Sequence, residues 1–481
     1  MLFEKFAKQA VASGRFAPLD QTYVMNKVRA LVGDADVDDD QRPVVDQLVD
    51  LAVQRKKIDD GPTAREILSD QLYDLLTPTP AVVNATFWNK YVESPQTATN
   101  WFYQLCTTNN YVKASAIKRN IEFTKRVQDG NQLEITINLS KPEKDPKAIA
   151  AAAHAKGKKY PQCALCMENE GYLGRLDHAA RSNHRIIRMM IGGKQWGFQY
   201  SPYAYFNEHC IFLDAKHEPM KINQQTLINL VEIEKQLPHY FVGSNADLPI
   251  VGGSMLAHEH YQGGKHVFPM MKAKLRQSIS FADYPDVTAG IVDWPMSDLR
   301  LISSNELALI NLGTHIINSW DHYSDEQLQI KAYDGTTRHH TVTPIMHRDG
   351  DQFVLDLVLR DNNTSDQYPL GIFHPHEELW HIKKENIGLI EVMGRAILPA
   401  RLKDELAEVK KFWLGQDNQI AASHLSWAKT VQARREITSA NVDEVLKEEV
   451  AQVFSDVLAD AGVFKKDDAG RAGWQRFIDQ L

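Results

Sequence analysis

The stretch GSNADLPIVGGSMLAHEHYQGG, residues 243–264, constrains the fold of this chain more than any other. If residues 256–262 form a strand, side chains two positions apart share one face, and His258, His260 and Gln262 form a row. A face with two imidazoles and an amide is unsuited to an ordinary apolar core. We therefore expect this strand to line a functional site, with the intervening residues facing the other way.

The row suits nucleophilic attack on phosphorus. A neutral imidazole nitrogen attacks a phosphoryl group and forms a phosphoramidate, which splits one difficult transfer into two easier ones. The attacking nitrogen keeps its lone pair when an acceptor fixes the proton on the other ring nitrogen. Gln262 can donate its amide to phosphoryl oxygens but cannot act as a general base, which favours a transferase over a hydrolase. An H-x-H pair alone is more often metal-binding or structural, but the glutamine and the flanking glycines favour catalysis.

The composition and net charge of the chain limit the classes of function that we expect for it. The chain has 481 residues, which predicts two main domains with an appendage. The net charge of −8 shows no basic excess, so we expect no nucleic-acid partner, and local donors must hold any phosphorylated substrate. The amino terminus shows no secretory pattern, and no apolar run approaches the ~20 residues that span a bilayer. With four cysteines, two of them in a C-x-x-C pair, we expect a reducing, cytoplasmic setting and no membrane contact.

Hydrophobic periodicity predicts a mixture of helices and strands. Helices are expected over residues 42–58, 63–76, 221–237 and 439–462, and over 384–414 with an interruption near Pro399. Strands are expected over residues 133–139 and 353–359. The Thr-Pro-Thr-Pro segment should end the second helix, because proline cannot continue a helix.

The H-x-H-x-Q string formed by His258, His260 and Gln262 resembles the signature of galactose-1-phosphate uridylyltransferases, a branch of the histidine-triad superfamily. The wider sequence is similar to the bacterial class II form of that enzyme. The segments that carry this resemblance are NLSKPEKDPK at 138–147, CALCMENEGYLGR at 163–175, QYSPYAYFNEHC at 199–210, GSNADLPIVGGS at 243–254 and GIFHPHEELWHIKKENIGLIEVMGRAILPARL at 371–402.

The resemblance implies a ping-pong reaction. UDP-glucose would give its uridylyl group to His260 and release glucose 1-phosphate, and galactose 1-phosphate would then take the group and leave as UDP-galactose. Gln262 matches the family glutamine that contacts the transferred phosphoryl group. Asn207 and Glu208 are similar to the residue pair that binds the nucleoside in class I enzymes, in which a proline replaces Glu259. The resemblance also implies a homodimer and no organic cofactor.

The C-x-x-C pair of Cys163 and Cys166 has the spacing of zinc ligands, although two reduced cysteines in a core are the simpler interpretation. The resemblance to class I enzymes implies that His217 and His258 complete the set. Such a closed Cys2His2 site would hold a structural zinc ion that fixes the nucleophile strand.

Arginines cluster in the segment GRLDHAARSNHRIIR. Because guanidinium groups bind phosphates through paired hydrogen bonds, we take Arg175 and Arg185 as candidates for substrate binding, although a solvated helical face is the simpler interpretation of any one of them. The remaining candidates for substrate binding are Asn245, Gly253, Ser254 and His376. His376 belongs to a second H-x-H triplet, which we expect near the active site of a partner subunit.

The resemblance implies an α+β fold with two related histidine-triad-like half-barrel sheets and flanking helices. We expect a mainly helical region over residues 1–130, an N-terminal transferase half over 131–240, a C-terminal half over 241–430 that starts with the nucleophile strand, and a helical tail over 431–481.

Two alternatives stay open. A histidine-triad hydrolase or phosphorylase acting on dinucleotides would be expected to carry a histidine in place of Gln262. A non-catalytic, zinc-stabilised nucleotide-binding protein would bind zinc and nucleotide without a covalent adduct.

Overall fold

The computed structural model describes residues 1–481 except 35–37, 141–159, 176 and 254. The chain divides into two compact units. Unit 1 comprises residues 1–116, the described part of 141–204, and 210–218. Unit 2 comprises residues 117–140, 205–209 and 219–481.

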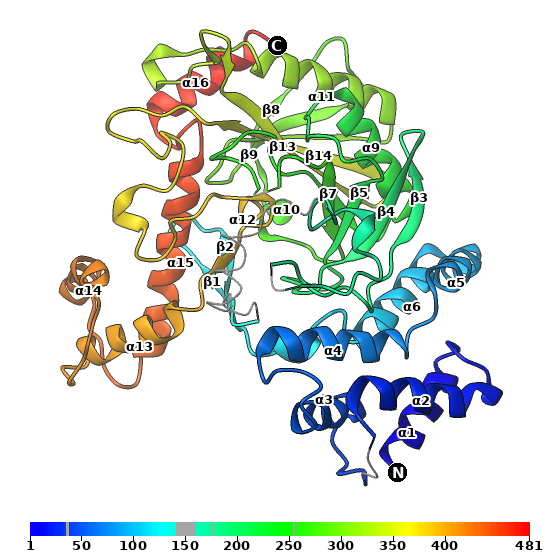
Figure 1. Cartoon of the computed structure of the whole chain (residues 1–481). Coiled ribbons are helices and arrows are strands. Elements are labelled where there is room, and N and C mark those ends of the chain that lie inside the picture. The colour runs from blue at the N-terminus through cyan, green and yellow to red at the C-terminus, as the bar shows by residue number, and fades with distance from the viewer. Residues whose placement is uncertain (35–37, 141–159, 176, 254) are drawn as a thin grey trace. The chain divides into compact units, whose positions relative to one another are not determined.

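Unit 1 begins with a run of helices and continues into antiparallel strands (Figure 1). Its elements are α1 (Leu2–Ala12), α2 (Gln21–Val32), α3 (Val44–Gln54), α4 (Pro62–Asp74), α5 (Pro80–Glu93), α6 (Pro95–Thr108), β3 (Ile187–Ile191), β4 (Lys194–Tyr200) and β5 (Cys210–Asp214), and α7 (Ala114–Ile117) follows α6.

The helices predicted over residues 42–58 and 63–76 are confirmed as α3 and α4. The Thr-Pro-Thr-Pro segment ends α4, as predicted, and it also starts α5. Pro80 stands in the first turn of α5, where the missing N–H of proline leaves no helical hydrogen bond unmade. Apolar side chains of α1 to α4, among them Phe6, Leu48 and Leu72, form the core of this helical group.

Unit 2 contains most of the strands. Its elements are β1 (Ile121–Arg126), β2 (Gln132–Ile137), α9 (Gln224–Gln236), β6 (Phe241–Gly243), β7 (His260–Gly264), α10 (Pro269–Lys272), β8 (Leu275–Ile279), β9 (Thr288–Val292), β10 (Asp298–Ser303), α11 (Glu306–Trp320), β11 (Tyr333–Asp334), β12 (Thr337–Arg338), β13 (His340–Asp349), β14 (Gln352–Asp361), α12 (Leu389–Val392), β15 (Arg395–Leu398), α13 (Leu402–Trp413), α14 (Ala422–Arg434), α15 (Val442–Ala461) and α16 (Asp468–Ile478). Its large sheet has the order β7-β6-β13-β14-β10-β9-β8, and β1, β2 and β15 form a separate small sheet.

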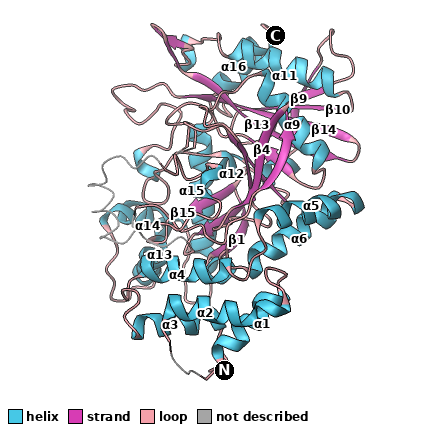
Figure 2. Cartoon of the chain, turned by 45° about the vertical axis from the view of Figure 1, so that its right-hand side comes forward, coloured by secondary structure: helices cyan, strands magenta, loops and turns pink. Residues whose placement is uncertain are grey.

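Two helix–strand–strand segments of unit 2 repeat one another and confirm the predicted α+β fold. α9 precedes β6 and β7, and α11 precedes β13 and β14. β6 and β13 pair antiparallel, and α9 and α11 pack on the same side of the strands (Figures 1 and 2). The two helices touch closely at Gly313, because a Cβ atom there would lie 2.9 Å from Leu227. The strand predicted over 353–359 and the helix predicted over 221–237 are confirmed as β14 and α9.

The prediction of a long helix over residues 384–414 is wrong. The segment forms α12, then β15, then α13. Gly394 takes a φ of +97°, which ends the helical path before β15, and a Cβ atom there would lie 2.8 Å from Trp294. β15 then pairs in parallel with β2, so a long-range strand pairing overrides the local helical pattern. The strand predicted over 133–139 is confirmed as β2.

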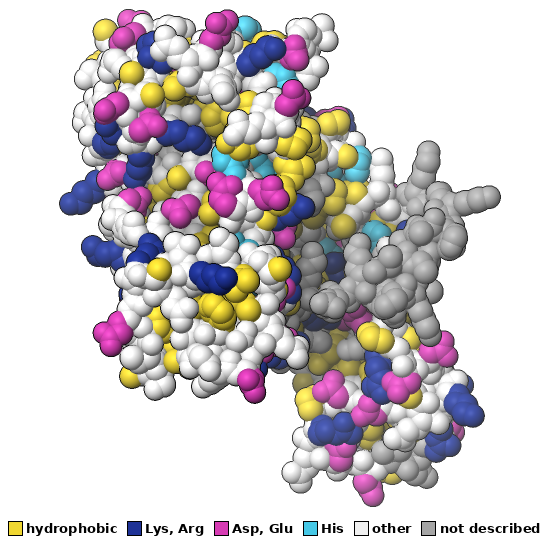
Figure 3. Space-filling model, turned by 90° about the vertical axis from the view of Figure 1, so that its left-hand side faces the viewer, with side chains coloured by type: hydrophobic (Ala, Val, Ile, Leu, Met, Phe, Trp, Pro, Cys, Tyr) yellow, Lys and Arg dark blue, Asp and Glu magenta, His cyan; other side chains and the backbone are white. Residues whose placement is uncertain are grey.

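The helix predicted over residues 439–462 is confirmed as α15, which lies along β1 and β2 (Figure 1). Its buried side chains, including Val450, Phe454 and Val457, join a hydrophobic core cluster of unit 2. Among the helices that the structure describes, none has the length and apolar character needed to cross a bilayer. Acidic and basic side chains are interspersed over the face shown in Figure 3, in keeping with the small net charge.

His381 makes the stability of unit 2 sensitive to acid. Its Nδ1 donates to the Glu378 carbonyl at 2.9 Å, and its buried Nε2 has no hydrogen-bond partner among the described residues. Burial, together with His424 and Arg401, lowers the pKa of His381 to about 4. In the unfolded chain the His381 side chain has a pKa near 6.5. Between pH 6.5 and 4 it therefore binds a proton in the unfolded chain but not in the folded chain.

We accordingly expect the thermal unfolding midpoint to fall as the pH drops from 6.5 to 4, with His381 contributing about 1.4 kcal/mol per pH unit. The variant His381→Gln should show a shallower pH dependence across this window. His322→Gln, which replaces an exposed histidine, is the matched control and should keep the wild-type slope. Equal slopes in the wild type and His381→Gln would show that His381 is not a source of acid sensitivity.

Candidate active site

His260 is the first residue of β7 and only 5% of its surface is exposed. Its Nδ1 lies 2.7 Å from the His258 carbonyl oxygen. Because a carbonyl only accepts, Nδ1 carries the proton and Nε2 carries the lone pair. Burial lowers the pKa of His260 to about 4, so the ring is neutral at neutral pH. This is the nucleophilic form of an imidazole.

The nucleophile strand starts later than predicted. Strand pairing begins at His260, and His258 lies in the bend before β7 instead of in a strand over residues 256–262. Close backbone approaches occur in the segment before it, where a Cβ atom at Gly252 would lie 2.3 Å from the Ala246 carbonyl oxygen. The two-residue alternation holds within β7, since Tyr261 points away from the row and donates to Glu259 at 2.7 Å.

Gln262 has a buried partner that the sequence did not reveal. Its side-chain oxygen lies 3.0 Å from Nε2 of His209, a residue with 3% exposure. His209 lies 53 positions before Gln262 in the chain. A histidine within the segment QYSPYAYFNEHC carries no periodic or spacing signal of its own, so only the folded chain reveals this pair.

Asn207 and Glu208 lie beside the end of β7. The Asn207 carbonyl accepts the Lys265 backbone N–H at 3.1 Å, and the buried Glu208 carboxylate accepts the Tyr240 hydroxyl. A Cβ atom at Gly264 would lie 2.6 Å from the Glu208 carbonyl oxygen, so only glycine permits this approach. The predicted nucleoside pair is therefore held against the strand that carries His260.

The glycine-rich loop places Asn245 and Gly253 together, whereas Ser254 lies outside the described residues. A Cβ atom at Gly253 would lie 2.7 Å from the Asn245 side-chain nitrogen. The Asn245 side-chain oxygen accepts the Leu389 backbone N–H at 2.9 Å, in the first turn of α12. Asn245 thus ties this loop to the segment that precedes β15.

Three sulfur- and nitrogen-bearing side chains of unit 1 converge. The Cys163 and Cys166 sulfurs lie 3.4 Å apart, and the Cys166 sulfur lies 3.2 Å from Nδ1 of His217. Burial, with the neighbouring Cys163, raises the pKa of Cys166 to about 12. Within unit 1 these three residues offer two sulfurs and a ring nitrogen that can serve as ligands to a metal ion.

The two predicted arginines differ in what they can bind. All five N–H groups of Arg185 are directed at protein acceptors, including the Pro78 carbonyl at 2.7 Å and Asp74 at 2.6 Å. Arg185 is 2% exposed, so the hypothesis that it binds a phosphate finds no support in its contacts. Arg175 is partly exposed and bonds Asp177 at 2.5 Å and the Tyr172 hydroxyl at 2.6 Å.

His376 lies in a loop, outside any strand. Its Nε2 is 3.0 Å from the Ile372 carbonyl, its backbone N–H donates to Asp460 at 3.0 Å, and its ring stacks on Tyr368 at 4.0 Å. Within unit 2 it fastens this loop to α15. The expected role at the active site of a partner subunit stays a prediction.

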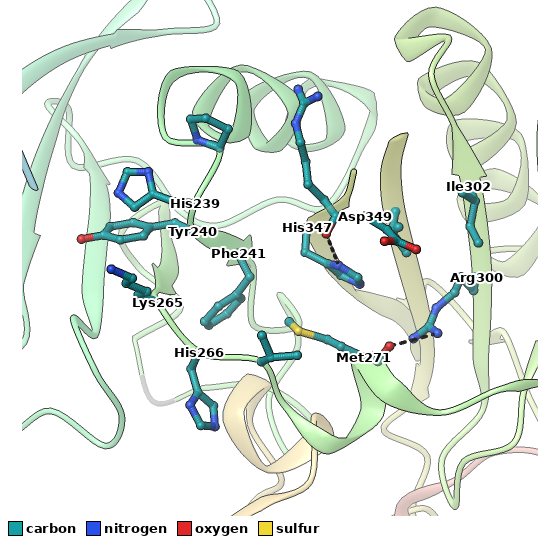
Figure 4. A pocket seen from close by; sticks show the side chains of 14 residues that line it. His239, Tyr240, Phe241, Lys265, His266, Met271, Arg300, Ile302, His347 and Asp349 are labelled. Atoms are coloured by element: carbon teal, nitrogen blue, oxygen red, sulfur yellow. Dashed lines mark hydrogen bonds between the residues drawn. The ribbon is translucent and has the colours of Figure 1, made fainter. Parts of the chain in front are cut away.

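A cavity of about 510 Å³ in unit 2 includes none of the predicted site residues in its lining (Figure 4). Lys265 lies at one side of it and Arg300 at the other. The two arginines of its wall are already paired, Arg300 with Asp356 at 2.5 Å and Arg348 with Glu234 at 2.6 Å. We therefore place the candidate active site at β7 and not in this cavity.

Known proteins match this chain over nearly its whole length. The models of the galactose-1-phosphate uridyl transferase N-terminal and C-terminal domains match residues 14–219 and 232–429. Curated proteins called galactose-1-phosphate uridylyltransferase include one from Lactobacillus helveticus, 68% identical over 100% of this chain and 99% of that protein. Another, from Pediococcus pentosaceus, is 57% identical over 99% of each chain.

Among solved structures, yeast Ap4A phosphorylase Apa2 aligns with a TM-score of 0.39 and 10% sequence identity, over 79% of this chain and 97% of that chain. A likeness of this size carries no argument about activity. The family matches favour neither a dinucleotide hydrolase nor a non-catalytic binding protein.

Proposed function

This chain belongs to the galactose-1-phosphate uridylyltransferase family, and we propose that it exchanges a uridylyl group between UDP-glucose and galactose 1-phosphate through a covalent bond to His260. The observation that carries this proposal is the 2.7 Å hydrogen bond from Nδ1 to the His258 carbonyl. It keeps the lone pair on Nε2 of a neutral, buried imidazole at the start of β7.

In the first half-reaction, Nε2 of His260 attacks the α-phosphorus of UDP-glucose. An N–P bond forms, the P–O bond to the β-phosphate breaks, and glucose 1-phosphate leaves with the electron pair of that bond. The Gln262 amide donates to the phosphoryl oxygens as negative charge shifts onto them, which stabilises the transition state more than the ground state. Nδ1 keeps its proton throughout, because the His258 carbonyl stabilises the charge that the ring acquires.

In the second half-reaction, a phosphate oxygen of galactose 1-phosphate attacks the same phosphorus. The N–P bond breaks, its electron pair returns to Nε2, and UDP-galactose leaves. Glutamine at position 262 offers water no general base, so the uridylyl-histidine lasts until the acceptor binds. We propose that Asn207 and Glu208 bind the nucleoside, that Arg175, Asn245 and Gly253 lie along the path of the phosphates, and that the enzyme is a homodimer.

The test of the proposed function is to mix the purified protein with UDP-glucose alone and to record its intact mass. We expect a gain of one uridylyl group, which disappears when galactose 1-phosphate is added and is replaced by free UDP-galactose. Release of UMP without a gain in mass would indicate a hydrolase. Bound nucleotide with neither adduct nor turnover would indicate a binding protein.

We propose that Cys163, Cys166, His217 and His258 hold a structural zinc ion. Two thiols and two imidazoles are the donor set of closed zinc sites, and the short sulfur–sulfur and sulfur–nitrogen distances within unit 1 suit a shared cation. When bound there, zinc would fix the segment before His260 without taking part in the reaction.

Metal analysis should find one zinc ion per chain in the wild type and none in Cys166→Ser. Loss of the ion should lower the thermal unfolding midpoint, by the equivalent of about 4 kcal/mol when free zinc exceeds its dissociation constant ~1,000-fold. Cys106→Ala is the matched control, because Cys106 is a buried cysteine outside the group and its loss should leave zinc content unchanged. A wild type that takes up no zinc would contradict the assignment.

A further inference from the structure

We propose that His209 is a positioning residue that holds the Gln262 amide with its NH2 group toward the transferring phosphoryl group. This inference rests on the proposed function of His260 and Gln262. It concerns a contact that no sequence motif predicted, the 3.0 Å approach of His209 Nε2 to the Gln262 side-chain oxygen.

The His209 ring is itself firmly held. Its backbone N–H donates to the Phe206 carbonyl at 3.3 Å, and its ring centroid lies 4.5 Å from that of Phe206 and 5.7 Å from that of Tyr205. Only 3% of the residue is exposed. A partner fixed in this way restricts the amide of Gln262, whose last torsion is otherwise broad.

The hydrogen bond decides which end of the amide faces the substrate. When Nε2–H of His209 donates to the Gln262 oxygen, the two amide N–H groups remain for phosphoryl oxygens. In the flipped arrangement the amide would donate to Nε2, and the oxygen of Gln262 would face the phosphoryl group and repel it. Flipping would also move the His209 proton to Nδ1, which is buried and has no partner among the described residues. A buried N–H without an acceptor is costly, so the first arrangement is favoured.

The protonation state of His209 agrees with this assignment. Burial lowers the pKa of His209 to about 4, so at neutral pH the ring carries one proton. That proton belongs on Nε2, because the nearest group there is an oxygen acceptor. His209 has no nitrogen left for substrate, since Nε2 is used by Gln262 and Nδ1 is buried, and it therefore acts through Gln262 and not as a catalytic group.

Replacing His209 with phenylalanine keeps a ring of similar shape and removes the donor. Losing one oriented donor to a transition state costs 10²- to 10³-fold in kcat, and a donor that remains but is misdirected should cost less. We expect His209→Phe to lower kcat about 10- to 100-fold and to change KM for UDP-glucose less than about threefold. His209→Gln, which presents an amide N–H near the position of Nε2, should recover part of the loss.

The decisive measurement is a double-mutant cycle. If His209 acts through Gln262, His209→Phe should have little further effect on kcat in a Gln262→Ala background. A purely structural role would give the same loss in both backgrounds, and that outcome would overturn the proposal. Thermal unfolding of each variant shows whether the protein is folded when its rate is measured.

A second measurement does not depend on activity. Nitrogen NMR of histidine-labelled protein, assigned with His209→Gln, should show the tautomer with the proton on Nε2 of His209. A proton on Nδ1 would overturn the proposal even if the His209→Phe variant failed to fold. A wild type that shows the expected tautomer but no uridylyl adduct would instead place the failure in the proposed function.

Discussion

The variant His260→Gly is expected to form no uridylyl adduct and to exchange the uridylyl group at least about 10⁴-fold more slowly than the wild type, the scale of loss seen when a covalent nucleophile is removed. His260 is the neutral imidazole whose proton is fixed by the His258 carbonyl. Without it, galactose 1-phosphate would have to attack UDP-glucose directly, and two phosphorylated substrates would have to occupy the site together. The remaining groups at β7 can orient a phosphoryl group but cannot form a bond to it.

Intact mass after incubation with UDP-glucose, together with the exchange rate, checks this expectation. His322→Gly, a change at an exposed histidine that follows α11, should form the adduct at the wild-type rate. An adduct on His260→Gly would show that another side chain is the nucleophile, and mapping of the labelled peptide would identify it.

Removing the buried guanidinium of Arg300 is expected to destabilise unit 2 strongly. Arg300 is 6% exposed, bonds Asp356 at 2.5 and 3.1 Å, and donates to the Met270 and Ala273 carbonyls at 3.0 and 2.9 Å. Burial alone would raise the pKa of Asp356, but Arg300 and His347 together lower it, so the carboxylate stays charged in the folded chain.

Arg300→Met would leave that carboxylate without its arginine partner and would remove one hydrogen bond from each of the two carbonyls. Asp298 lies beside Asp356, and burial together with Asp356 raises the pKa of Asp298. A second negative charge is therefore already unfavourable in this region. Breaking a buried ion pair costs about 3–5 kcal/mol, which corresponds to a fall of roughly 6–20 °C in the unfolding midpoint.

The control for Arg300→Met is Lys235→Met, which breaks an exposed ion pair of 2.9 Å with Glu306. An exposed pair contributes less than about 1 kcal/mol. The double variant Arg300→Met with Asp356→Leu should regain much of the lost stability, since it removes both charges together. If Arg300→Met were no more destabilising than Lys235→Met, the buried pair would not be a main source of stability in unit 2.

The sequence allowed the parts of the fold with regular periodicity to be predicted. Apolar residues at helical spacing predict the helices α3, α4, α9 and α15. Alternation or a short apolar run predicts the strands β2 and β14. The segment over 384–414 has helical spacing as well, yet Gly394 and the pairing of β15 with β2 place a strand within it. Strand pairing between distant segments is not encoded in local spacing, so this error could not be avoided from the pattern alone.

In the candidate site, too, the sequence predicts some features and not others. The alternation of His260 and Gln262 along β7 could be predicted, because it depends only on the two-residue period of a strand. His209 could not, since its contact with Gln262 depends on the path of the chain between them. Arg185 was a natural phosphate ligand by residue type, but residue type does not reveal that carbonyls such as that of Pro78 already occupy its donors.

The repeat of α9–β6–β7 and α11–β13–β14 has a consequence for how this protein can change over evolution. In the first copy, residues 244–259 connect the two strands and contain the glycine-rich loop and His258; in the second, residues 350–351 alone make the connection. The row of His258, His260 and Gln262 thus lies in the first copy, with His258 in the long connection and the other two residues on β7. The second copy carries none of the candidate site residues, and its strand β14 instead contributes Asp356 to the buried ion pair with Arg300 of β10. Selection for catalytic activity and selection for stability can therefore act on different segments of one chain.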